Sequence, residues 1–128
     1  MPIQFALDKN VAQAVFTSAA RTATSSVDWA GNMSCKGIEL FIDVTAAAGM
    51  PSVVFTINNL DPNSGKTRTV LTSAAITGTG TTILRVYPGI TTGTNVAVSD
   101  FIAPFGRITA THANTDSITY SVTANFIR

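Results

Sequence analysis

The segment that decides the fold is the stretch at residues 117–126, SITYSVTANF. Its apolar side chains fall at every second position, and the positions between them carry Thr, Ser or Asn. Successive side chains of a strand point to opposite faces, so this alternation predicts a β-strand with one buried face and one face in water. The side chains predicted for the buried face are Ile118, Tyr120, Val122, Ala124 and Phe126.

The same pattern recurs upstream. At residues 37–45, four aliphatic side chains alternate with a face that carries Glu39, Phe41 and Asp43. Further strands are predicted at residues 52–58, 67–73, 81–87 and 107–112, with Val53, Phe55 and Ile57 sharing one face of the first of them. Turn residues separate the segments, as in GMP at 49–51 and DPNSG at 61–65. Short strands at this spacing predict an all-β single domain, an antiparallel β-sandwich of jelly-roll-like form.

Residues 1–36 are the least patterned part of the chain. We expect an extended N-terminal arm with one or two short strands, at residues 15–18 and 22–27, before the sandwich domain of residues 37–128. Residues 11–20 are Ala-rich, but their β-branched and aromatic members favour a strand or extended arm over a helix. A short helix in a loop is a weaker alternative at residues 95–101.

The composition suits a protein that packs against other proteins. The chain has 128 residues, the usual size of one domain, and 12% of them are charged, whereas about 25% is typical. A surface with few charges favours packing into an assembly, and a hydrated Thr-rich surface is the alternative. The net charge is +1 and the basic residues are scattered, so no basic stripe predicts nucleic-acid binding.

The compartment is predicted from three features. A single cysteine excludes an intrachain disulfide bond. The first residues lack the basic and apolar regions of a secretory signal, and no apolar run reaches the ~18 residues of a membrane span. We therefore expect synthesis in the cytoplasm and no membrane partner.

Two motifs in one turn suggest ligand binding, and each lacks a required part. Residues 63–67, NSGKT, are similar to the end of a phosphate-binding loop, but that loop requires Gly at the position of Leu60 and a helix afterwards. Asp61 and Asn63 suggest a calcium loop, but calcium takes ~6–8 oxygen ligands and no further acids follow. A turn in which Asp61 bonds its own backbone is the preferred interpretation, with Gly65 in a left-handed conformation.

The residues that carry catalysis elsewhere are isolated here. Cys35 and His112 are the only Cys and His, and a nucleophilic pair requires the two to meet. Glu39 and Asp43 lie ~13 Å apart along an extended strand, wider than glycosidase carboxylate pairs. We therefore predict no enzymatic activity, no metal, no cofactor and no small-molecule substrate.

Trp29 is the only tryptophan and precedes the first strongly patterned strand. An exposed tryptophan stacks on sugars or anchors a protein interface. The alternative is a side chain that closes the end of the core.

Several segments together resemble the small structural proteins of tailed bacteriophages. The segments that carry the resemblance are IELFIDVTA at 38–46, LDPNSGK at 60–66, VYPG at 86–89, RITATH at 107–112 and ITYSV at 118–122. They span residues 37–128 and form a pattern of strands and turns, with no catalytic signature.

The resemblance implies a virion structural protein, most simply a decoration or cement protein on the capsid surface. Its partners would be the major capsid protein at subunit junctions, further copies of itself as in a trimer, or both. For the arm, which lies outside the resemblance, our contact candidates are Phe5, Leu7, Val15 and Phe16, with Trp29 beside them. The alternatives are a tail terminator or tube protein, and a glycan- or receptor-binding module that uses Trp29 and Tyr87.

Overall fold

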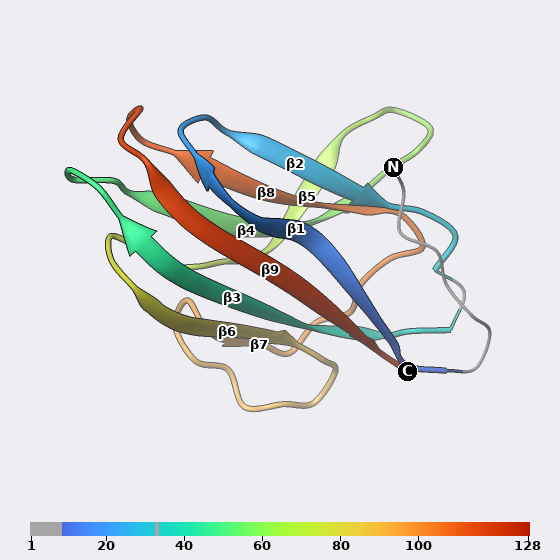
Figure 1. The fold of residues 1–128 in the computed structure, drawn as a ribbon. Helices are drawn as coiled ribbons and strands as arrows, with labels where there is room; N and C mark the ends of the chain where they lie inside the picture. The colour runs from blue at the N-terminus through green and yellow to red at the C-terminus, as the bar shows by residue number, and fades with distance from the viewer. Residues whose placement is uncertain (1–8, 33) are drawn as a thin grey trace.

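The computed structural model describes residues 9–32 and 34–128, which form nine β-strands and no helix (Figure 1). Consequently, no helix in the described part of the chain is suited to crossing a membrane. The strands, in chain order, are β1 (Val11–Arg21), β2 (Ser25–Trp29), β3 (Gly37–Ala47), β4 (Val53–Leu60), β5 (Thr67–Thr72), β6 (Gly80–Val86), β7 (Ala97–Val98), β8 (Gly106–His112) and β9 (Ile118–Ile127).

The strands form two sheets that face each other across one core. The first sheet has the order β1-β9-β3-β6-β7 and the second the order β2-β8-β4-β5. All neighbouring strands are antiparallel except the short β7, which runs parallel to β6. The chain crosses between sheets at most of its connections, and this interleaved order is that of a jelly roll. The predicted all-β sandwich is confirmed.

The core consists of the side chains that the alternation assigns to the inner faces. Every apolar position predicted for the inner side of β9 is buried, as are Val53, Phe55 and Ile57 on β4. Aromatic rings join the two sheets: Trp29 meets Phe126 edge-to-face with centroids 5.6 Å apart, and Phe55 meets Tyr120 at 5.3 Å. Residues distant in sequence thus form one continuous apolar layer.

The segment expected to be an arm supplies one strand to each sheet. The expected short strand at residues 15–18 lies inside the eleven-residue β1, and β2 begins at Ser25 and pairs with β8. A register shift between Ala14 and Phe16 turns the adjacent side chains of Val15 and Phe16 both into the core. That shift breaks the alternation, which is why the sequence pattern of β1 is weak. At residues 95–101 the structure has β7 and no helix.

Arg21 stabilises the irregular part of β1. A second register shift between Phe16 and Ala19 interrupts the ladder with β9. The Arg21 guanidinium donates hydrogen bonds to the Tyr120 carbonyl oxygen at 2.8 Å and to the Ala19 carbonyl oxygen at 3.2 Å. It also lies 4.8 Å from the centroid of the Tyr120 ring, a cation–π arrangement. One side chain thus replaces ladder bonds that the irregular backbone does not make.

Candidate interaction surface

The contact candidates from the N-terminal segment are placed in the core wherever the structure describes them. Phe5 and Leu7 lie outside the described residues. Val15 and Phe16 are buried, and Trp29 is 0% exposed with its Nε1 donating a 2.9 Å hydrogen bond to the Ala103 carbonyl oxygen. These three side chains therefore hold the sheets together and present no contact surface to a partner.

The turn at residues 61–65 binds its own backbone. The Asp61 carboxylate accepts hydrogen bonds from the Asn63 backbone N–H at 3.0 Å and from the Ser64 hydroxyl at 2.8 Å. The Ser64 bond, followed by the backbone bond from Asn63, lowers the pKa of Asp61 below its usual range. Gly65 has a φ of 77°, the left-handed conformation expected for it. The prediction of a self-bonded turn is confirmed.

Cys35 and His112 lie at opposite ends of the sandwich. His112 is hydrogen-bonded to the hydroxyl of Tyr120, whereas the residue after Cys35 bonds the carbonyl oxygen of Ile127. The two contacts, at Tyr120 and Ile127, are seven positions apart along β9, roughly 23 Å along an extended strand. The pair therefore does not meet. Within residues 9–32 and 34–128, no group of three or more His, Cys, Asp or Glu side chains is arranged to hold a metal.

The burial of His112 makes stability depend on pH. Burial, and secondarily the positive charge of Arg21, lowers the pKa of His112 below 6.5. The unfolded chain therefore binds more protons than the folded chain just below pH 6.5, and the free energy of unfolding falls as the pH drops through that range. We expect a larger loss of stability between pH 7.5 and 5.0 for the wild type than for His112→Gln, measured by urea unfolding. Equal losses in the two proteins would show that His112 is not the titrating group.

The outer face of the first sheet carries an uncharged row across four strands. In the ladder register, Phe41 on β3 lies between Thr123 on β9 and Ile83 on β6, and Thr123 continues to Ala14 on β1. Phe41 is 40% exposed although it lies in the middle of a sheet. We call the outer surface around this row the Phe41 face.

The carboxylate groups beside this row accept hydrogen bonds within the face. On one side, the Glu39 carboxylate accepts hydrogen bonds from Arg85 Nε at 3.1 Å and from the Asn125 amide at 3.2 Å. On the other side, the Thr81 hydroxyl donates to the Asp43 carboxylate at 3.4 Å. A partner that covers the Phe41 face therefore meets an exposed aromatic ring, small polar groups, the ion pair of Glu39 with Arg85, and the Asp43 carboxylate.

Two depressions lie at the margins of the molecule. One, of about 320 Å³, lies between β4, β5 and the loop before β8, beside Phe101, whose ring lies 5.8 Å from the Arg68 guanidinium. Arg68 also forms a 2.8 Å salt bridge with Asp100, so its charge is compensated. The other, of about 230 Å³, lies where β3 begins and β6 and β9 end. We call it the end depression, and its lining residues are Ile38, Glu39, Arg85, Val86, Tyr87, Ile90 and Ile127.

Comparison of the chain with protein-family models, with curated proteins and with solved structures gives no match.

The outward position of Phe41 is the one signal for this surface that is present in the sequence. The alternation at residues 37–45 places Phe41 on the same face as Glu39 and Asp43, a face otherwise expected to be polar. A single exposed apolar side chain is common on protein surfaces, so Phe41 is informative through its uncharged cross-strand neighbours, which include Ile83.

Proposed function

We propose that this chain is a non-enzymatic virion structural protein that decorates a capsid and binds at capsid subunit junctions through its Phe41 face. The observation that carries the proposal is the uncharged row containing Phe41, which is 40% exposed on the outer side of the first sheet. The major capsid protein is the proposed partner, and the capsid surface is the proposed location.

Contact with a partner at the Phe41 face would bury apolar surface that is now in water. Burial of apolar surface stabilises a complex by roughly 25 cal/mol per Å², before the costs of association. The carboxylate of Glu39 keeps Arg85 and Asn125 as partners when a protein covers it. Covering the face therefore removes Phe41 and Ile83 from water while Glu39 retains its hydrogen bonds.

Two further observations support a virion role. Jelly rolls recur among viral capsid proteins and also among lectins and cupins, so the fold agrees with the proposal without selecting it. The resemblance of residues 37–128 to small structural proteins of tailed bacteriophages favours the virion among these. Low charge over the whole chain, 12%, suits a domain held in an assembly.

Replacing Phe41 with Lys is expected to abolish binding to capsids while leaving the domain folded. The substitution places a solvated charge at the centre of the proposed contact, and the position is outward-facing, so the core is untouched. The measurement is co-sedimentation of the full chain with DNA-free heads of the virus that encodes it. We expect a reduction in affinity of at least tenfold.

Phe101→Lys is the matched control, because Phe101 is also an exposed aromatic, at 52%, but lies away from the Phe41 face. It is expected to bind heads like the wild type. The proposal is overturned if the wild type does not sediment with heads, or if Phe41→Lys binds as well as the control. Binding to isolated tails but not to heads would assign the face to a tail structural protein instead.

The structure gives no specific support to the glycan-binding alternative. Trp29, one of its two aromatic candidates, is buried. The other, Tyr87, is partly buried, and its hydroxyl donates a 2.9 Å hydrogen bond to the Arg128 carbonyl oxygen.

A further inference from the structure

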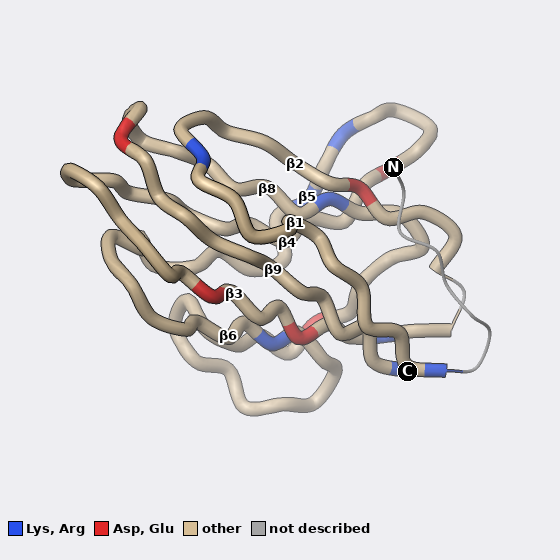
Figure 2. The backbone as a smooth tube through the Cα atoms, in the orientation of Figure 1, with Lys and Arg blue, Asp and Glu red and all other residues tan. Residues whose placement is uncertain are grey.

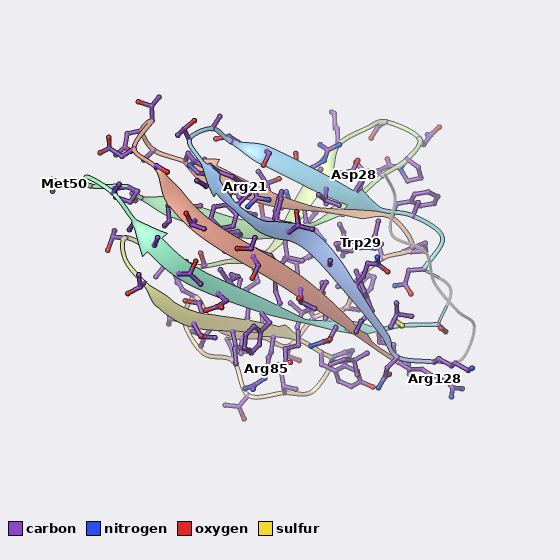
Figure 3. All side chains as sticks on the ribbon, viewed as in Figure 1. Arg21, Asp28, Trp29, Met50, Arg85 and Arg128 are labelled. Atoms are coloured by element: carbon purple, nitrogen blue, oxygen red, sulfur yellow. The ribbon has the colours of Figure 1, made fainter. Side chains whose placement is uncertain are left out.

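The loop between β3 and β4 presents an exposed methionine on a fixed backbone. Met50 is 83% exposed and lies at the tip of the molecule, where Figure 3 labels it. Its backbone N–H donates a 2.9 Å hydrogen bond to the Asp116 carboxylate, and its carbonyl oxygen accepts one of 2.9 Å from the Asn114 amide. Asn114 in turn accepts a hydrogen bond from the Asp116 backbone N–H at 3.0 Å. Two loops thus fix the backbone from which one apolar side chain projects into water.

Gly49 packs closely against Asp116 at this tip. Its φ is +75°, a conformation that glycine favours, and a Cβ at this position would lie 2.9 Å from the Asp116 Oδ2 atom. The residues before it, Ala46, Ala47 and Ala48, are exposed and small. The backbone of the tip is therefore held by hydrogen bonds, and the adaptable Met50 side chain and the three alanines form an apolar knob on it. We call residues 46–50 the Met50 knob.

The end depression lies at the other end of the same strand. It includes Ile38 and Glu39 at the beginning of β3, whereas the Met50 knob comprises the last two residues of β3 and the start of the loop after it. Eleven strand residues span roughly 35 Å, so one molecule cannot insert its own knob into its own depression. Figure 3 shows this separation, with Met50 at one end and Arg128, next to the lining residue Ile127, at the other.

The depression has the chemistry and size to receive an apolar side chain. Five of its seven lining residues are apolar or aromatic, and the charges of Glu39 and Arg85 are paired with each other. Its volume is about 230 Å³, whereas a cavity of about 150 Å³ accommodates benzene. An unbranched thioether side chain adapts readily to such a space.

The charges at the two ends are complementary. The acid beside the knob is Asp116, while the cation at that end, Arg21, is turned onto the rings of Phe16 and Tyr120. At the depression end, the segments that contain Lys9, Lys36 and Arg128 meet, and Figure 2 shows Lys or Arg positions in blue near the C label. Backbone contacts hold these segments together, since Lys36 N–H bonds Ile127 and Arg128 N–H bonds the Asn10 side chain.

We propose that the chain associates with further copies of itself head to tail, with the Met50 knob of one copy seated in the end depression of the next. Such a contact joins two different surfaces and is heterologous, so it closes into a ring or continues as a row. This inference goes beyond the proposed function and does not depend on it, because it requires no capsid.

The test uses two single variants of the full chain, each disabling one side of the contact. Met50→Lys removes the knob and places a cation near the basic end of the neighbour, while Ile90→Glu places a charge in the apolar depression. Sedimentation velocity is expected to show concentration-dependent oligomers for the wild type and monomers for each variant alone. A mixture of the two variants retains one intact knob and one intact depression, so it is expected to form dimers and nothing larger.

Phe101→Lys, which changes an exposed apolar residue outside both surfaces, is expected to associate like the wild type. Circular dichroism of each variant checks that the sandwich is intact. A wild type that remains monomeric at millimolar concentration would overturn the proposal. So would variants that associate normally, or a mixture that shows no dimer. The test contains no virus particle, so its failure leaves the capsid-binding proposal untouched, and the reverse also holds.

Discussion

Trp29→Ala is expected to lower the free energy of unfolding by about 3–5 kcal/mol, the usual cost of removing a large buried aromatic. The indole is 0% exposed, packs edge-to-face on Phe126 and donates a hydrogen bond to the Ala103 carbonyl oxygen. Its loss leaves a cavity between the sheets and an acceptor without its donor. Urea unfolding followed by circular dichroism measures the effect.

Phe101→Ala provides the comparison, because that ring is 52% exposed and its removal is expected to cost less than about 1 kcal/mol. The two outcomes separate the alternatives that the sequence leaves open for Trp29. A Trp29→Ala protein of unchanged stability that has lost its partner would support an interface anchor. Marked destabilisation would support the core role that the structure assigns to it.

Gly106→Ala is expected to lower the free energy of unfolding about as much as Trp29→Ala does, although it adds a single methyl group. Gly106 is the ladder partner of Trp29, and a Cβ at position 106 would overlap three carbon atoms of the indole ring. Overpacking a core costs about 1–3 kcal/mol when neighbours can adjust. Here the obstructing group is a buried ring held by its own hydrogen bond, so we expect a loss at or above the upper end of that range.

Gly78→Ala serves as the control, because nothing lies within 4 Å of a Cβ added there and its φ is not in the left-handed region. Its stability is expected to stay within about 0.5 kcal/mol of the wild type. The contact between positions 29 and 106 is tested by combining Gly106→Ala with Trp29→Leu. The double variant is expected to lose less stability than the two single losses added together, since the smaller side chain makes room for the methyl group. Strict additivity would contradict the steric explanation.

The strands with one buried face and regular pairing were predictable from sequence. In β4 and β9 every second side chain is buried over most of the strand, so hydrophobic alternation contains the same information as the fold. The end of β3 departs from this at a register shift between Val44 and Ala46, where its side chains become exposed. A strand therefore shows alternating apolar residues in its sequence only where its side chains alternate between the core and the solvent.

The strands that the sequence predicted only in part, or not at all, differ from the others for identifiable reasons. In β1 the register shifts bury two successive side chains, and Arg21 replaces ladder bonds, so neither feature produces a period of two. β7 has two residues, too few for any period. β2 is five residues long, and its buried tryptophan depends on a glycine that is 77 positions later in the sequence, at Gly106.

The candidate surfaces were only partly accessible to sequence reasoning. The alternation of the sequence correctly predicted that Phe41 points outward. Only the pairing register of the strands shows that Ile83, Thr123 and Ala14 complete an uncharged row with it. The Met50 knob depends on hydrogen bonds from a loop more than 60 residues away, at Asn114 and Asp116. Contacts between distant loops leave no local pattern in a single sequence.

The measurement that most directly tests a capsid-decorating role is a cryo-electron microscopy reconstruction of heads incubated with the purified full chain. The account predicts density for the sandwich at capsid subunit junctions, oriented with the β1-β9-β3-β6 sheet toward the shell and Phe41 at the contact. Heads without added density, or density in which the β2-β8-β4-β5 sheet faces the shell, would contradict it.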